Sequence, residues 1–166
     1  MKQEHYWIDG PWKGRLAIVG RPRGNDWLED EIFAWKNSGF DAVVSLLTLD
    51  EEAELGLESE MQLSKSVGIL YASFPVTDRS VPHDFVGSVR LIREIEGWLV
   101  NGKNVAVHCR QGIGRSAVLA ACLLVSAGLQ PDAAFARLTK ARGCTVPETQ
   151  EQREWVMQFS REIAHA

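Results

Sequence analysis

Hydrophobic and polar positions along the chain form two kinds of pattern. Short, nearly continuous apolar runs are typical of strands buried on both faces of a sheet. Longer stretches with apolar residues every three or four positions are typical of amphipathic helices. The pattern predicts strands over residues 6–8, 16–19, 41–47, 69–74 and 104–107, and helices over residues 25–37, 61–67, 84–100, 115–127, 131–142 and 149–164. This alternation predicts an α/β fold with a mostly parallel central sheet of about four to five strands, flanked by helices.

Local signals refine three of these segments, and composition characterises one stretch between them. Asn25 and Asp84 are each predicted to be helix N-caps, because asparagine and aspartate accept hydrogen bonds from the first free N–H groups of a helix. The helix over residues 115–127 is apolar almost all round, so we expect it to be central and buried. Residues 50–60 are rich in acids, which favours a solvated loop or helix face.

Composition narrows the class of protein. A chain of 166 residues fits a single domain spanning residues 1–166. Its formal net charge of −4 gives no electrostatic support for a nucleic acid or an anionic membrane as partner. We find neither a signal peptide nor a membrane-spanning stretch, and therefore expect a cytoplasmic protein, taken here as a monomer.

The three cysteines do not suggest a structural framework. Cys109, Cys122 and Cys144 are irregularly spaced and include no CxxC pair, which argues against a disulfide framework or a zinc site. Cys122 and Cys144 are expected to be small buried hydrophobic residues. The sequence leaves open whether either takes part in redox regulation.

Cys109 stands in a different setting, the stretch His-Cys-Arg-Gln-Gly-Ile-Gly-Arg-Ser over residues 108–116, between a predicted strand and a predicted helix. Gly112 and Gly114 allow positive φ, so that successive N–H groups can line an anion-binding loop. The helix beginning near Arg115 adds its free N–H groups and dipole, and the guanidinium adds a planar pair of donors. Such surroundings favour the thiolate form of Cys109. The loop therefore combines an oxyanion binder with an activated nucleophile.

This motif resembles the phosphate-binding signature of the cysteine-dependent protein tyrosine phosphatase superfamily. Residues 74–82, Phe-Pro-Val-Thr-Asp-Arg-Ser-Val-Pro, resemble the acid-bearing loop of its compact dual-specificity branch. Ala117 departs from the pattern, since these proteins often carry glycine there. The resemblance implies a tyrosine-phosphatase-like fold and a reaction that requires no metal or cofactor.

The resemblance also implies a role for each residue. Cys109 would attack phosphorus to form a phosphocysteine, and Asp78 would protonate the leaving oxygen and then activate water. Ser116 would hydrogen-bond the sulfur, and His108 would support the loop from the strand. The implied phosphate-binding residues are Arg110, Gln111, Gly112, Ile113, Gly114 and Arg115.

Two assignments have alternatives. Asp84 is the rival of Asp78 as the acid, although it stands where a helix N-cap belongs. Gln152 would place the hydrolytic water by the resemblance, but Thr149 and Gln152 also have the spacing of a capping box.

The sequence thus predicts a phosphatase of phosphomonoesters, with phosphotyrosine, phosphoserine or phosphothreonine in a protein, or a small phosphomonoester, as substrate. The alternatives are a phosphoinositide, nucleotide or RNA phosphatase, a phosphate-binding pseudophosphatase that serves as an interaction module and, less favoured, a sulfur-transfer enzyme. Arg21, Arg23 and Arg79 could add positive charge at the rim of the site.

Overall fold

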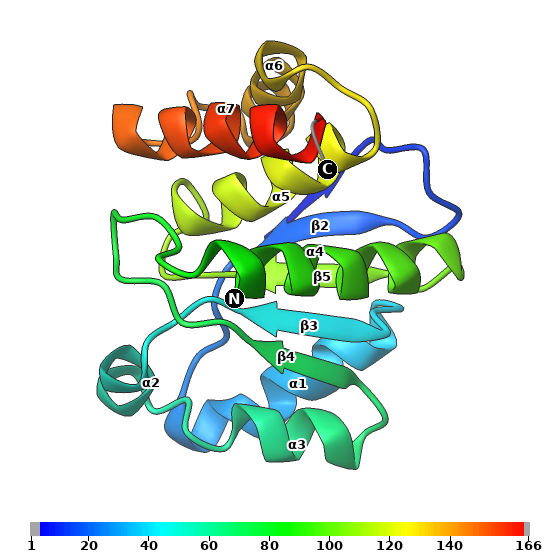
Figure 1. Ribbon diagram of the computed structural model, residues 1–166. Helices are drawn as coiled ribbons and strands as arrows, with labels where there is room; N and C mark the ends of the chain where they lie inside the picture. Colours follow the sequence, from blue (N-terminus) through cyan, green and yellow to red (C-terminus); the bar gives the residue numbers. More distant parts are fainter. Residues whose placement is uncertain (1–3, 165–166) are drawn as a thin grey trace.

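The computed structural model describes residues 4–164, and its centre is a five-stranded sheet in the order β1-β2-β5-β3-β4 (Figure 1). The strands are β1 (His5–Ile8), β2 (Leu16–Val19), β3 (Ala42–Ser45), β4 (Leu70–Ser73) and β5 (Val105–His108). Only the β1–β2 pair is antiparallel among these strands. The predicted α/β class and the mostly parallel sheet are therefore confirmed.

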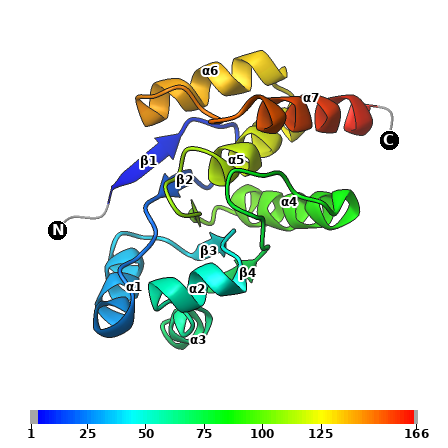
Figure 2. The ribbon, with the colours of Figure 1, turned by 90° about the vertical axis from the view of Figure 1, so that its left-hand side faces the viewer.

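Helices cover both faces of this sheet (Figure 2). They are α1 (Leu28–Asn37), α2 (Leu49–Leu55), α3 (Glu60–Ser66), α4 (Phe85–Val100), α5 (Arg115–Ser126), α6 (Pro131–Arg142) and α7 (Gln150–Ala164), with a short 3-10 turn η1 (Asn25–Trp27) before α1. Alternate residues of one strand face opposite layers: Ile18 packs with α4 to α7, whereas Ala17 packs with α1 and α3. None of the helices among residues 4–164 is long and apolar enough to cross a membrane.

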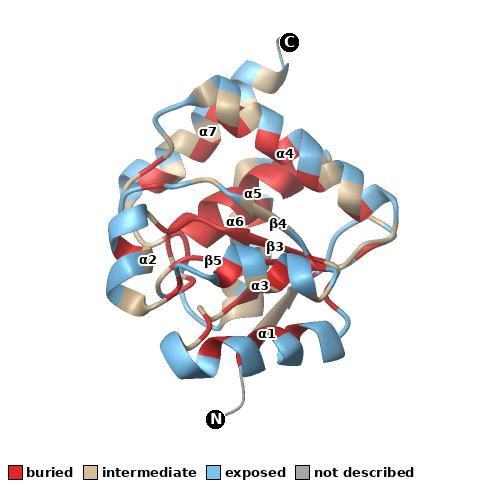
Figure 3. Ribbon diagram, turned by 90° about the horizontal axis from the view of Figure 1, so that it is seen from below, coloured by how far each residue is buried: buried red, intermediate tan, exposed pale blue. Residues whose placement is uncertain are grey.

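Helix α5 is the central element of the larger layer, as predicted. Every residue from Arg115 to Val125 is buried, which is visible as the continuous buried colouring of this helix in Figure 3. A helix enclosed on all sides has little freedom to move, so the loop before it is fixed to a rigid element. Cys122 is fully buried here, and burial raises the pKa of its thiol, which keeps it unreactive. Cys144 is exposed, so the prediction that it is buried is wrong.

Two helix-start predictions have opposite outcomes. Asp84 caps α4, because its Oδ1 accepts a hydrogen bond of 2.9 Å from the Gly87 N–H. Asn25 caps no helix: its φ is 53°, and its own N–H donates to the Gly56 carbonyl at 2.9 Å. That long-range bond turns the chain before α1, and the helix begins three residues later than predicted.

The acidic stretch over residues 50–60 is largely solvated, as its composition favours, with Asp50, Glu54 and Glu58 exposed, but two of its acids are buried. Thr48 and Glu51 form a reciprocal capping box that starts α2. Glu51 is 8% exposed and Glu60 is fully buried. Both acids are buried because cationic or imidazole side chains from distant parts of the chain bind them, which composition alone does not reveal.

Candidate active site

The loop over residues 109–114 lies at the carboxyl end of β5, between two parallel neighbours, β2 and β3. The strand ends at His108, whose carbonyl accepts a hydrogen bond of 3.0 Å from the Leu46 N–H just after β3. Helix α5 begins at Arg115. The strand, loop and helix are those expected from the sequence, and crevices at the carboxyl ends of parallel strands commonly bind ligands.

The sulfur of Cys109 receives a hydrogen bond from its own loop. The Gly112 N–H donates to Sγ at 3.3 Å, and Cys109 is 3% exposed. Gly112 has the expected positive φ, 73°. A Cβ there would also lie 3.1 Å from Ile18 Cγ2. Glycine therefore suits this position both because of its positive φ and because of the tight packing against Ile18.

Gly114 is needed for space and not for positive φ, which corrects the expectation for this residue. Its φ is −124°. A Cβ at this position would lie 2.5 Å from Glu148 Oε1 and 2.9 Å from Gln152 Nε2. The side chains that precede and begin α7 therefore approach the loop backbone closely.

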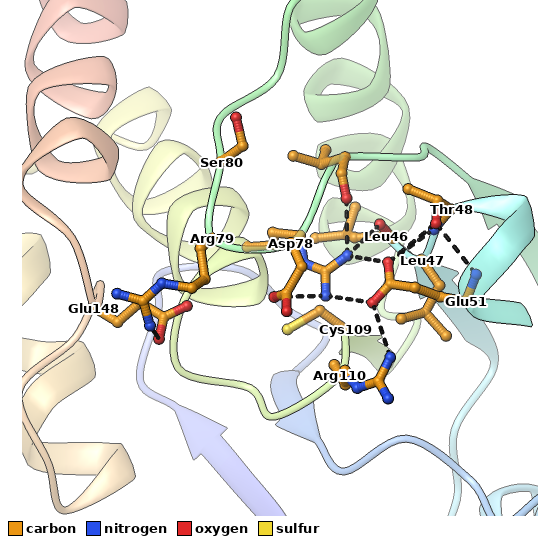
Figure 4. Close-up of polar contacts among 12 residues, drawn as sticks. Leu46, Leu47, Thr48, Glu51, Asp78, Arg79, Ser80, Cys109, Arg110 and Glu148 are labelled. Atoms are coloured by element: carbon orange, nitrogen blue, oxygen red, sulfur yellow. Dashed lines mark hydrogen bonds and ion pairs between the residues drawn. The ribbon is translucent and has the colours of Figure 1, made fainter. Parts of the chain in front are cut away.

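Arg115 is held on several sides by oxygen atoms, among them those of Glu51 and Asp78, which are labelled in Figure 4. Its Nη1 donates to Glu51 Oε1 at 2.6 Å, and its Nη2 donates to Glu51 Oε2 at 2.9 Å. Nη1 also donates to the Val76 carbonyl at 2.8 Å. The second N–H of Nη2 binds Asp78 Oδ1 at 3.0 Å. The guanidinium is thus fixed by the two carboxylate oxygens of Glu51 in α2. Its remaining edge contacts Asp78 in residues 74–82, which we call the acid loop.

The charges of this pair are mutually stabilised. Burial disfavours the ionised form of each side chain, but it is outweighed. Hydrogen bonds from Arg115 and Thr48 lower the pKa of Glu51. The same pairing, with the charges of Cys109 and Asp78, raises the pKa of Arg115. Arg115 therefore keeps its positive charge although its side chain is only 1% exposed.

Asp78 and Asp84 are clearly distinguished by position. The Asp78 side chain is 53% exposed, contacts Arg115 and lies near Cys109 in Figure 4. Asp84 is engaged at the N-terminus of α4. The structure therefore brings Asp78 together with Arg115 and Cys109, which share the stretch over residues 108–116, and leaves the rival acid as a cap.

Two of the arginines expected at the rim, Arg23 and Arg79, are paired with acids, and so is Arg110 in the loop. Arg110 binds Glu54 at 3.1 Å, and Arg79 binds Glu148 at 3.1 Å. Arg23 does not add charge to the rim, because it pairs with Glu31 on α1. The rim consequently carries little uncompensated positive charge from these residues.

His108 lies beneath the loop, where support was expected. Its Nε2 lies 2.6 Å from Glu60 Oε1, and both side chains are fully buried. The Trp35 ring packs against the imidazole with a centroid separation of 5.8 Å. Ser116 is also fully buried, but its hydroxyl makes no hydrogen bond to the described residues, so the bond to sulfur that the resemblance implies is not formed in this structure.

Gln152 meets one of the two descriptions that the sequence left open, the capping box. Thr149 and Gln152 form the reciprocal bonds of a capping box, at 3.1 and 3.2 Å. The Gln152 Nε2 also donates to the Ser80 carbonyl in the acid loop at 3.1 Å and lies against Gly114. The side chain thus caps α7. It also joins the acid loop to the loop over residues 109–114, which we call the phosphate loop.

Three acids at the site escaped the sequence analysis: Glu51, Glu60 and Glu148. A usable signal existed for one, since Thr48 and Glu51 have capping-box spacing directly after the strand over residues 41–47. The other two are identified only by partners brought close through the fold.

The sheet order, the cysteine loop and the arginine at the start of α5 define a chain of the cysteine-dependent tyrosine phosphatase class. A family model, Tc-R-P, described as polymorphic toxin system, DSP-PTPase phosphatase, matches residues 17–129. The chain belongs to this family, which places it in the dual-specificity-like part of the superfamily and confirms the resemblance.

Known proteins extend the comparison. The chain is 28% identical over 131 residues to cyclin-dependent kinase inhibitor 3 of Rattus norvegicus, covering 78% of this chain but 61% of that relative. The structure of kinase-associated phosphatase with its catalytic-site cysteine replaced by serine matches with a TM-score of 0.92 at 20% identity, over 100% of this chain and 98% of that one. The active form of Tk-PTP matches with a TM-score of 0.78 at 28% identity, over 95% and 96% of the two chains.

Proposed function

We propose that this chain is an active, metal-independent phosphomonoesterase that works through a phosphocysteine on Cys109. The observation that carries the proposal is the convergence of three groups. Cys109 accepts a hydrogen bond from a loop N–H on its sulfur, the charged guanidinium of Arg115 is fixed by Glu51, and Asp78 binds the edge of that guanidinium that Glu51 leaves open. Nucleophile, oxyanion binder and acid are the groups that phosphoryl transfer to a cysteine requires.

In the first step the thiolate of Cys109 attacks phosphorus, and the bond from phosphorus to the ester oxygen breaks. Asp78 gives its proton to that oxygen, so the alcohol leaves neutral. Arg115 and the loop N–H groups hold the three equatorial oxygens, where charge is spread in the transition state. In the second step Asp78 takes a proton from water as the water attacks phosphorus, and the sulfur leaves as thiolate.

For Arg115 to bind phosphate, Asp78 must move from the N–H of Nη2. Glu51 occupies one N–H on each terminal nitrogen, and Val76 takes the other on Nη1. The edge formed by Nε and Nη2 is then the one that can present two parallel donors to a phosphate. Asp78 holds the position that a phosphate oxygen would take, from which it can swing to the leaving oxygen.

The charges at the rim favour a singly phosphorylated group on a protein over a polyphosphate. Glu54 and Glu148 compensate Arg110 and Arg79, and the formal net charge of the chain is −4. A polyphosphorylated inositol or an RNA would find little uncompensated positive charge from Arg110 and Arg79 to bind its several phosphates. A phosphotyrosine, phosphoserine or phosphothreonine side chain places one dianion in the loop.

A phosphate-binding module without catalysis is the second candidate. The observation that favours it is that the Ser116 hydroxyl, implied to help the sulfur leave, makes no hydrogen bond to the described residues, a lack that would impair turnover and not phosphate binding. Its retention of both Cys109 and Asp78 argues for catalysis, because a module that only binds phosphate has no use for an acid.

Hydrolysis of para-nitrophenyl phosphate in the presence of EDTA tests the proposal. We expect turnover by the wild type and by Cys144→Ser, whose thiol is exposed, and none by Cys109→Ser. Tungstate, a tetrahedral dianion, should bind all three proteins. Binding by the wild type without turnover of any phosphopeptide or small ester would instead establish the binding module, and full activity of Cys109→Ser would refute the nucleophile. A panel of phosphotyrosine, phosphothreonine, phosphoinositide and nucleotide substrates then fixes the class.

A further inference from the structure

Arg142, the last residue of α6, contacts the phosphate loop from outside. Its Nε donates to the Gly112 carbonyl at 2.9 Å, and its Nη2 donates to the Gln111 carbonyl at 3.3 Å. One guanidinium therefore binds the carbonyls of two successive peptide groups in the loop. No motif in the sequence marks this residue, since it lies 30 positions after Gly112.

The peptide group between Gln111 and Gly112 links Arg142 to the nucleophile. The C=O and N–H of a trans peptide point in opposite directions. The carbonyl of this peptide accepts from Arg142, and its N–H donates to Cys109 Sγ at 3.3 Å. The guanidinium and the sulfur thus lie at the two ends of one peptide dipole.

We propose that Arg142 is a positioning residue that orients these two peptide groups, so that their N–H groups face the thiolate and the bound phosphate. A positive charge on the carbonyl side also polarises each peptide and strengthens its N–H as a donor. The inference rests on the proposed phosphatase function, and it assigns to Arg142 no contact with substrate.

A further contact fixes the guanidinium in this place. Its Cζ lies 4.0 Å from the centroid of the Tyr6 ring in β1, a cation–π contact that holds the guanidinium over the ring. Arg142 is therefore held between an edge strand of the sheet and the loop.

Arg137 provides a matched control on the same helix. Its Nη1 donates to the Asp9 carbonyl at 2.9 Å, so it is likewise an arginine that binds a backbone carbonyl, but one remote from the loop. Comparing Arg142→Met with Arg137→Met separates loop positioning from the general loss of a helix-to-backbone bond. Arg142→Lys keeps the charge but loses the planar fork that reaches two carbonyls.

The experiment measures tungstate affinity by calorimetry and the pH midpoint of Cys109 alkylation by iodoacetamide, in a Cys144→Ser background that removes the exposed thiol. We expect Arg142→Met to weaken tungstate binding about tenfold and to move the alkylation midpoint to higher pH. Arg142→Lys should fall between, and Arg137→Met should match the parent.

The inference is overturned if Arg142→Met and Arg137→Met have the same tungstate affinity and alkylation midpoint. If Arg142→Met does not fold, Arg142→Lys decides, because an unchanged affinity and midpoint in that variant refute the need for the fork. Failure of the proposed function is distinguishable, because the parent protein itself would then hydrolyse no phosphate ester, whatever Arg142→Met does to tungstate binding.

Discussion

Glu51 holds the guanidinium of Arg115 through two parallel hydrogen bonds, from Nη1 to Oε1 at 2.6 Å and from Nη2 to Oε2 at 2.9 Å. The two residues are 64 positions apart, and the pair ties α2 to the start of α5. The main donor of the phosphate site is thus oriented by an acid from another part of the fold, in a bidentate geometry that adds direction as well as energy.

Stability should depend on pH through this pair. The folded pKa of Glu51 is lowered, so its ionised form stabilises the fold above the unfolded pKa, near 4.3, and this contribution is lost as the pH falls through the folded value. We expect Glu51→Gln to lower the free energy of unfolding by about 2 kcal/mol at pH 7, and by progressively less below pH ~4.

Denaturant unfolding at several pH values checks this. Glu54→Gln is the control, because Glu54 is in the same helix but its side chain is 63% exposed and pairs with Arg110 at the surface. Its unfolding free energy should stay close to that of the wild type. A Glu51→Gln deficit that does not shrink in acid would contradict the assignment.

Asp78→Asn should separate catalysis from phosphate binding. Loss of the proton donor should lower kcat about 100-fold for an ester with a poor leaving group, such as phenyl phosphate, and much less for one whose leaving group needs no proton. Because Asp78 occupies an N–H of Arg115, the same variant should bind tungstate more tightly. Steady-state kinetics and calorimetry measure the two effects. Asp84→Asn should preserve kcat, since asparagine also caps a helix. If kcat fell more in Asp84→Asn than in Asp78→Asn, Asp84 and not Asp78 would be the general acid.

The fold and the centre of the site were predictable because their determinants are local. The apolar runs of β2, β3 and β5 are each buried on both faces, and such runs are visible in sequence. The cysteine loop carries its glycines and its arginine within a few positions of Cys109, so its chemistry could be proposed before the structure was known.

The supporting residues could not be predicted, because each depends on a contact made by the fold. Glu60 lies 48 positions from His108, and Arg142 lies 30 positions after Gly112. In the sequence Glu60 is one acid among several, and only burial beside the imidazole gives it a specific role. The start of α1 was predicted three residues too early for the same reason, because the N–H of Asn25 donates to the carbonyl of the distant Gly56.

Glu60 should be essential for stability. Replacing it with leucine leaves the buried Nε2 of His108 without its partner, and breaking a buried pair of this kind costs about 3 kcal/mol. Chemical denaturation measures the loss. Glu60→Gln keeps a hydrogen-bonding side chain and should lose less, and Glu58→Gln, at an exposed position just before α3, should lose almost nothing. Equal stability of the Glu58 and Glu60 variants would show that the buried pair contributes nothing.

Gly114→Ala tests how closely α7 must approach the phosphate loop. The new methyl group would lie 2.5 Å from Glu148 Oε1 and 2.9 Å from Gln152 Nε2, so either these side chains or the loop must shift. A displacement on the order of 1 Å in the loop can lower kcat/KM by about 100-fold. Gly97→Ala is the control, since nothing lies within 4 Å of its Cβ position in the middle of α4, where alanine should add about 0.5–1 kcal/mol of stability. Kinetics and thermal unfolding of the two variants, measured together, separate a local effect on the loop from a general effect of removing glycine. Wild-type kcat/KM in Gly114→Ala would mean that the contacts of Glu148 and Gln152 with the loop can relax without cost to the reaction.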